Sequence, residues 1–176
     1  MRFDGSTAEC LVFTRAEGLL SAFAHDLKIR AETFAVGIDD ATGAVTAELD
    51  PASLRVVCAM RGGEEAPGLL GADDLQTIAA TIARDVLEVR RYPVIRFRSS
   101  RLTMAAPGEA GLRIDGTLDL HGTPRAVTIH AARQGGCYVA ETTFHQPDFG
   151  IRPYSAMLGA LRVAADVRVR MAIPLS

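Results

Sequence analysis

The chain has 176 residues, 48% of them hydrophobic and 23% charged, and its formal net charge at pH 7 is −2. This length and composition are typical of one globular domain with a substantial core, here residues 1–176. The charge gives no support for nucleic-acid binding, because proteins that bind nucleic acids usually carry a basic excess on one face.

The N-terminal segment, residues 1–6, lacks the apolar core and the small-residue cleavage site of a signal peptide. Farther along, no apolar run approaches the ~20 residues of a membrane-spanning helix. Cys10, Cys58 and Cys137 are widely spaced, and an odd number of cysteines does not suit a secreted disulfide framework. We therefore expect a cytoplasmic protein with no membrane span.

The first third of the chain alternates apolar and polar residues, the period of a strand with one dry and one wet face. Residues 9–16 form the first predicted strand, which contains Phe13. The next, residues 25–38, changes the phase of its alternation near 31–33. This change indicates a bulge or a strong bend in one long strand. Further strands are predicted at 45–49 and 54–59.

One helix is predicted over residues 73–90. Apolar residues recur there at helical spacing, at Leu75, Ile78, Ala79, Ile82, Val86 and Val89. Asp73 is the candidate N-cap, with Gln76 as its capping partner. Pro93 ends the helical region, because proline cannot continue a helix.

After Pro93 the chain is predicted to be strand, at 94–104, 112–120, 123–132, 137–144 and 161–175. The last strand keeps apolar residues at every second position from Leu161 to Leu175, far beyond the usual ~5–6 residues. Counted with the earlier segments, this pattern predicts an all-β fold. The expected fold is an extended eight-stranded antiparallel barrel with one inserted α-helix at about 73–90, one strand fewer than the nine predicted segments.

An eight-stranded barrel is either filled by its own side chains or holds one small ligand. Gly116, Ala131 and Ala165 are small residues at mid-strand on the apolar face. They either leave a long, narrow, apolar space or accommodate large neighbours such as Phe97 and Phe13, and both interpretations stay open. Such a space suits an extended hydrocarbon chain. Burying about ten methylenes at ~0.8 kcal/mol each yields roughly 8 kcal/mol before the costs of binding.

Catalytic motifs are weak in this chain. His25 shares its strand face with apolar residues, and a hydrogen-bonded structural histidine is the simpler role for it. His145, Asp148 and Arg152 lie in the loop 145–152, and such a cluster at a barrel mouth could serve acid–base chemistry or hold a phosphate. No spacing of His and Cys indicates a metal site.

Four runs of residues form a pattern in their order and spacing. They are His25-Asp26-Leu27, Tyr92-Pro93-x-Ile95-x-Phe97-x-Ser99, Gly116-x-Leu118-x-Leu120-x-Gly122-x-x-x-x-Val127 and Asp148-Phe149-Gly150-Ile151. Together with the helix before Tyr92 and the alternating last strand, they resemble the YceI-like, polyisoprenoid-binding family over nearly the whole chain. The His-Asp-Leu run resembles one variant of that family.

The resemblance implies an extended lipocalin-like barrel with a long inner tunnel. Members of the family bind amphiphiles such as polyprenyl phosphates, isoprenoid quinones or fatty-acid-like molecules, with the tail in the tunnel and the head group near the mouth. It also implies a homodimer, and it implies neither catalytic residues nor a cofactor. Two features depart from the family: many members have a signal peptide, and many have a basic residue shortly before the Asp-Phe-Gly element, where this chain has residues 144–147, Phe-His-Gln-Pro.

Three hypotheses follow for the function. The first is a non-enzymatic protein that transports, stores or sequesters an isoprenoid or fatty-acid-like amphiphile. The second is an enzyme that acts on a lipid-like substrate through His25 and Asp148. The third is a ligand-free barrel that serves as an interaction module. For the first hypothesis the predicted ligand-binding residues are Phe13, His25, Phe34, Val36, Ile78, Ile82, Ile95, Phe97, Ile114, Gly116, Leu118, Ile129, Phe149, Arg152, Val163 and Val167.

Overall fold

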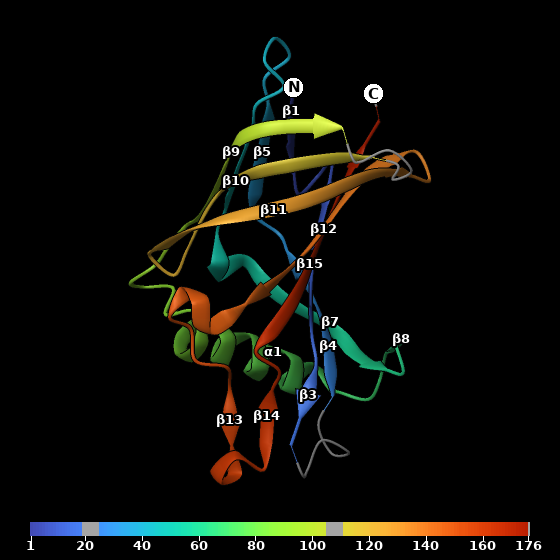
Figure 1. The fold of residues 1–176 in the computed structure, drawn as a ribbon. Coiled ribbons are helices and arrows are strands. Elements are labelled where there is room, and N and C mark those ends of the chain that lie inside the picture. The colour runs from blue at the N-terminus through green and yellow to red at the C-terminus, as the bar shows by residue number, and fades with distance from the viewer. Residues whose placement is uncertain (19–24, 105–110, 176) are drawn as a thin grey trace.

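The computed structural model describes residues 1–18, 25–104 and 111–175. Its main feature is one antiparallel sheet of 12 strands that curls around an apolar interior (Figure 1). The spatial order of its strands is β1-β5-β6-β9-β10-β11-β12-β15-β2-β4-β7-β8. The strands are β1 (Arg2–Asp4), β2 (Glu9–Thr14), β4 (Asp26–Ala31), β5 (Phe34–Ile38), β6 (Val45–Leu49), β7 (Leu54–Arg61), β8 (Glu64–Ala66), β9 (Ile95–Met104), β10 (Leu112–Leu120), β11 (Thr123–Gln134), β12 (Cys137–His145) and β15 (Asp166–Pro174).

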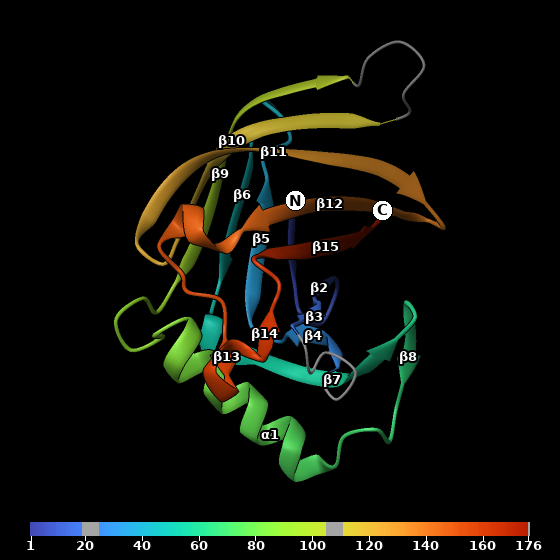
Figure 2. The same cartoon turned by 60° about the horizontal axis from the view of Figure 1, so that its bottom comes forward.

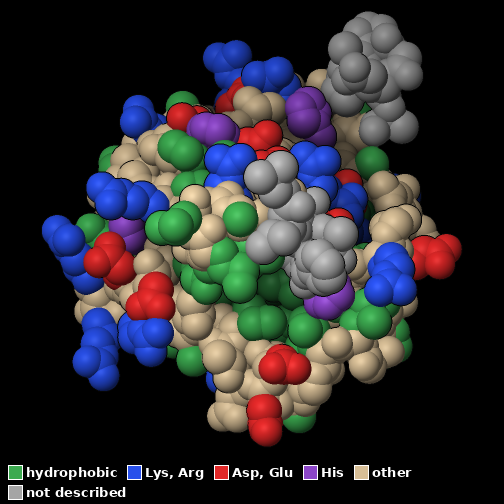
Figure 3. Space-filling view, turned by 90° about the horizontal axis from the view of Figure 1, so that it is seen from below, with side chains coloured by type: hydrophobic (Ala, Val, Ile, Leu, Met, Phe, Trp, Pro, Cys, Tyr) green, Lys and Arg blue, Asp and Glu red, His purple; other side chains and the backbone are tan. Residues whose placement is uncertain are grey.

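A second, 3-stranded sheet has the order β13-β14-β3. Its strands are β13 (Ser155–Ala156), β14 (Leu161–Val163) and β3 (Ala16–Glu17). It lies at the end of the molecule opposite both chain termini (Figure 1). Figure 3 views the molecule from this end, where hydrophobic side chains gather in the middle of the face and charged ones surround them.

The mostly β architecture with one helical segment agrees with the prediction, but the predicted eight strands are wrong in number. One cause is bending, which divides long strands between distant parts of the sheet. The predicted strand 25–38 is divided into β4 and β5, which lie near opposite ends of the strand order. The predicted bend between them is confirmed, and hydrogen bonds continue through it from Glu32 N–H to the Ser53 carbonyl (3.3 Å) and from Asp50 N–H to the Thr33 carbonyl (3.0 Å).

The prediction of one unbroken strand over 161–175 is also wrong. β14 ends at Val163 and β15 begins at Asp166. Between them Ala164 N–H donates to the Arg15 carbonyl (2.8 Å), and the Ala165 carbonyl accepts from Gln146 N–H (2.9 Å). Alternation persists through this break because both alanines are apolar, so the pattern alone could not locate it.

The helical segment is α1 (Ala72–Thr81), continued by one π-helical turn (Ile82–Val86). It packs beside β7 at the lower end of the sheet (Figure 2). Its N-cap is Gly71, whose N–H donates to the Asp74 carboxylate (3.1 Å), so Asp73 is not the cap. The prediction placed the cap two residues too late, because it looked for a capping side chain where a glycine backbone serves.

Strands β11 and β12 are paired over only part of their length. Their register runs from His130–Glu141 to Gln134–Cys137, and the remaining halves, 123–129 and 142–145, face each other without ladder pairing. A short 3-10 helix, η4 (Gln146–Phe149), lies next to this split and is held to β11 by a hydrogen bond from Arg125 Nε to the Asp148 carbonyl (2.9 Å). The split and η4 together form the walls of a surface hollow.

Candidate functional site

The curled sheet encloses an apolar cavity of about 620 Å³. This volume lies within the ~300–1,000 Å³ that is usual for small-molecule sites. Half of the predicted ligand-binding residues line it, mainly from the inward faces of β5, β9 and β10. They are Phe34, Val36, Ile95, Phe97, Ile114, Leu118, Ile129 and Val167.

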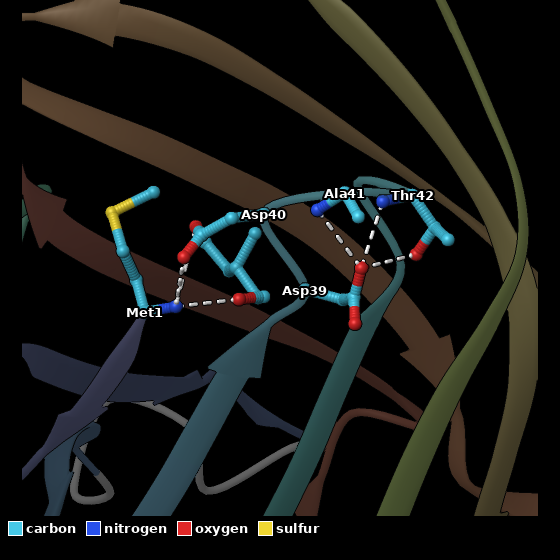
Figure 4. Close-up of polar contacts among 6 residues, drawn as sticks. Met1, Asp39, Asp40, Ala41 and Thr42 are labelled. Carbon is cyan, nitrogen blue, oxygen red and sulfur yellow. Dashed lines mark hydrogen bonds and ion pairs between the residues drawn. The ribbon is translucent and has the colours of Figure 1, made fainter.

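One end of the cavity is lined by residues of both chain termini, among them Pro174 and Leu175. The two termini lie at the same end of the molecule (Figure 1). Met1, Gly43 and Tyr138 lie there. A tight turn at 39–43 shapes this rim: the Asp39 carboxylate accepts hydrogen bonds from Ala41 N–H (3.0 Å) and from Thr42 N–H (2.7 Å) and hydroxyl (2.8 Å) (Figure 4). These bonds, the Thr42 hydroxyl first, lower the pKa of Asp39.

The Met1 amino group joins the same turn. It donates to the Ile38 carbonyl (2.7 Å) and lies 3.3 Å from the Asp40 carboxylate (Figure 4). β1 thereby stays aligned along β5, which supplies Phe34 and Val36 to the cavity wall.

Sequence reasoning missed many lining residues, for several reasons. Val169, Met171 and Ile173 share the face of Val167 on β15, and the alternation would have found them. Cys10 and Val12 were missed because the prediction chose the other face of β2. Leu87 was missed because it follows the helix and falls outside its apolar stripe.

The expectation that Phe13 lines the interior is corrected. Its ring lies on the outer face of the sheet, with the Arg168 guanidinium carbon 4.5 Å from the ring centroid. Leu11, on the same face of β2, is nevertheless buried. Long basic side chains shield apolar groups on an outer face in this way, so β2 is apolar on both faces and its inward face could not be chosen from its pattern.

Gly116 lies against Phe97 and leaves no space of its own. A Cβ placed on Gly116 would come within 2.6 Å of the Phe97 ring and of the Arg98 carbonyl oxygen. Of the two interpretations of the small residues, accommodation of a large neighbour therefore holds at Gly116. Ala131 instead lines the cavity.

Four other predicted residues lie elsewhere in the fold. Ile78 and Ile82 do not line the cavity; they pack against the buried cluster around Ile29 and Val56, because the helix lies beside β7. Val163 belongs to the small sheet, opposite Ala16. Phe149 is buried in η4, where its ring meets that of Phe144 edge to face at 6.1 Å.

The predicted polar residues do not converge. His25 is half-buried and Arg152 is exposed. Neither residue lines the cavity or the hollow at the split between β11 and β12. Asp148 lies in η4, and within the described residues it has no hydrogen bond or ion pair with His25. The enzyme hypothesis requires a direct hydrogen bond between His25 and Asp148, and the described residues do not make this contact.

A smaller hollow of about 430 Å³ lies at the split between β11 and β12. Thr142 and Phe144 line both this hollow and the cavity. Its polar wall includes Arg125 and His145, and His145 Nδ1 lies 2.7 Å from the Asp166 carboxylate.

Two titratable groups of the cavity lining, Cys10 and Glu48, have surroundings that define their state. Burial raises the pKa of the Cys10 thiol to about 12, so the thiol stays protonated near neutral pH. Glu48 is the one acidic residue of the lining, and Arg96 Nε donates to its carboxylate (3.0 Å). Across the described ranges, no group of three or more His, Cys, Asp or Glu is placed to hold a metal ion. Nor does any described helix have the length and apolar character to cross a membrane.

Residues 3–175 match the model of the YceI-like domain. The chain belongs to the YceI-like family. A search of curated protein sequences finds no match.

Solved structures share this YceI-like fold at low sequence identity. Burkholderia cenocepacia BcnA is 15% identical, with a TM-score of 0.65 over 98% of this chain and 99% of that one. A polyisoprenoid-binding domain from Saccharophagus degradans, implicated in plant cell wall breakdown, is 13% identical, with a TM-score of 0.55 over 96% and 94%. The Campylobacter jejuni YceI protein is 13% identical, with a TM-score of 0.58 over 84% and 82%.

Proposed function

We propose that this chain is a non-enzymatic binding protein that holds a long-chain amphiphile, isoprenoid or fatty-acid-like, with its hydrocarbon in the 620 Å³ cavity. The observation that carries the proposal is the lining: the sheet buries Phe97, Ile114 and Leu118 around an open volume. The protein would transport, store or sequester this ligand. The Saccharophagus degradans domain of the same fold is a polyisoprenoid-binding domain, which supports this ligand class.

The energy of burial is sufficient for such a role. Ten methylenes removed from water contribute roughly 8 kcal/mol at ~0.8 kcal/mol each. The loss of free motion on binding offsets part of this, which leaves affinities in the micromolar range or tighter. Because a hydrocarbon chain has no polar groups that the protein could recognise, the cavity can select among tails only by their length and volume.

The lining also favours binding over catalysis. The protonated thiol of Cys10 is a poor nucleophile, because the thiolate is the reactive form. The carboxylate of Glu48 is already paired with Arg96. A cytoplasmic location and a homodimer stay predictions, which cell fractionation and analytical ultracentrifugation would test.

Lipid extraction tests the proposal directly. The protein is purified without detergent, examined by native mass spectrometry, and extracted into organic solvent for lipid analysis. We expect an added mass that matches an extracted long-chain compound, or uptake of such a compound after incubation with a polyprenol, a quinone and a fatty acid. A clean apo mass after all three incubations would overturn the proposal.

A further inference from the structure

One side chain in the apolar cavity is polar and buried at once. Gln146, the first residue of η4, lines the cavity and is only 8% exposed. The other lining residues with polar side chains are Glu48, Tyr138 and Thr142, and all of them are more exposed to solvent. The buried amide therefore needs hydrogen-bond partners within the protein or from a ligand.

Within the described residues, the protein supplies partners for both backbone groups of Gln146 and for one hydrogen of its amide nitrogen, but none for its amide oxygen. Its N–H donates to the Ala165 carbonyl (2.9 Å), and its carbonyl accepts from Ile151 N–H (3.2 Å). Its side-chain Nε2 donates to the Ala164 carbonyl (3.0 Å). Within residues 1–18, 25–104 and 111–175, no group donates to Oε1.

The orientation of this amide is determined by its surroundings. A carbonyl oxygen accepts and never donates, so the amide nitrogen must face Ala164. Turning the amide over would bring two oxygens together. The break between β14 and β15 supplies this carbonyl, because Ala164 lies between the two strands. Oε1 is thereby left as an unused acceptor on a residue that lines the cavity.

The charge of the lining limits which ligand group can meet Oε1. Among the described residues that line the cavity, none is Lys, Arg or His, and the one acidic residue is Glu48. The Met1 amino group lies at the cavity rim, next to the turn at 39–43. A phosphate or carboxylate beside Gln146 would have no cationic side chain of the lining to pair with, and its oxygens would repel Oε1. A neutral hydroxyl has the opposite property, since it carries the proton that Oε1 lacks.

We propose that Gln146 Oε1 is a head-group site that accepts a hydrogen bond from the hydroxyl of a neutral long-chain alcohol or phenol. The inference rests on the proposed function and makes it more specific, because it names the polar end of the amphiphile. The hydrocarbon fills the apolar lining, and the hydroxyl supplies the hydrogen-bond donor that Gln146 Oε1 lacks within the described residues. Anionic head groups are selected against beside Gln146.

A competition between matched ligands tests the proposal. The protein is incubated with equal amounts of geranylgeraniol, its methyl ether and geranylgeranyl phosphate, separated from free lipid by gel filtration, and extracted for quantification. The ether keeps the chain and lacks the proton. We expect the alcohol to be recovered roughly tenfold over the ether, the ratio that one hydrogen bond supplies, and the phosphate to be recovered least.

Two variants locate the effect. Gln146→Met keeps the length of the side chain without its amide, and we expect the alcohol-to-ether ratio to fall to about one while total lipid uptake persists. Gln134→Met is the matched control, because it makes the same substitution at an exposed glutamine of β11 that does not line the cavity. We expect the ratio in this variant to stay within about twofold of the original.

A second measurement keeps the proposal falsifiable if Gln146→Met does not fold. The chain has three glutamines, Gln76, Gln134 and Gln146, so labelling glutamine with ¹³C at the side-chain carbonyl yields a simple spectrum. We expect the Gln146 signal, assigned by replacing the other two, to shift with the alcohol and much less with the ether.

The outcomes separate this inference from the proposed function. If none of the three lipids is retained, both fail. If the alcohol and the ether are retained equally, the binding function stands and the Gln146 site falls. If the phosphate is retained best, the neutral head group is wrong.

Discussion

At the scale of single residues, the cavity depends on which side chains leave space and which fill it. The Phe97 ring occupies the position that a side chain at Gly116 would need, since a Cβ there would lie 2.6 Å from ring atoms. Open volume therefore arises elsewhere, beside residues such as Ala131. Alternation predicted Phe97, Ile114 and Leu118 on the wall, because β9 and β10 each have one apolar face. The alternation misplaced Phe13, because both faces of β2 carry apolar residues.

Cys10 provides a pH-dependent prediction at this scale. Burial raises the pKa of its thiol to about 12, whereas the unfolded chain titrates near the ordinary ~8.5–9. Below that range the thiol is neutral in both states and its contribution to stability is complete. Above it the unfolded state loses the proton first, so stability is lost as pH rises from about 9 to about 12, by up to ~1.4 kcal/mol per pH unit.

Urea unfolding between pH 8 and pH 11 measures this effect. Tyrosine and lysine also titrate there, so the comparison is between the parent chain and Cys10→Ala. We expect the two free energies of unfolding to converge as the pH rises, because only the parent carries the thiol penalty. Parallel curves over the whole range would show that the Cys10 site does not resist ionisation.

At the scale of elements, the split between β11 and β12 interrupts the hydrogen-bonded ladder of the sheet. The two strands pair only from His130–Glu141 to Gln134–Cys137. η4 lies next to the unpaired halves, anchored by the Arg125–Asp148 hydrogen bond and by the bonds of Gln146. Local pattern could not show this, because the residues of both halves alternate as in any paired strand.

We expect Arg125→Ala to loosen η4 without unfolding the protein. The substitution removes the hydrogen bond from Arg125 Nε to the Asp148 carbonyl, an exposed contact whose loss costs about 1 kcal/mol or less. Amide hydrogen exchange should become faster in residues 146–151 and little changed in the rest of the sheet.

Arg133→Ala is the control for this prediction. Arg133 is exposed on the paired half of the same strand, opposite Tyr138. Exchange in η4 should be the same in this variant as in the parent chain. If both variants exchange alike, the Arg125 contact does not hold η4 in place.

At the scale of the whole molecule, the curled sheet positions residues from distant strands around one volume. We expect Ala140→Phe, which adds a ring on the cavity face of β12, to reduce lipid uptake at least tenfold, because the ring occupies ligand volume. Gel filtration followed by lipid quantification measures this uptake, and a thermal melt checks that the variant folds.

Ala35→Phe is the matched control. Ala35 alternates with Phe34 and Val36, which line the cavity, so its side chain lies on the other face of β5. Lipid uptake should stay within about twofold of the parent chain, because the added ring lies outside the cavity. Equal losses in both variants would mean that the ligand does not occupy the cavity.

The sequence by itself determined the strand-rich class, the bend near 31–33, the helix before Pro93 and much of the cavity wall. It could do so because alternation and helical spacing are local properties that burial on one face imposes. Only the tertiary structure decided which face of β2 is inward, where the last strand breaks, and that Gln146 Oε1 accepts no hydrogen bond from the described residues. These features depend on partners distant in sequence, since the carbonyls of Ala164 and Ala165 accept from the side-chain and backbone nitrogens of Gln146.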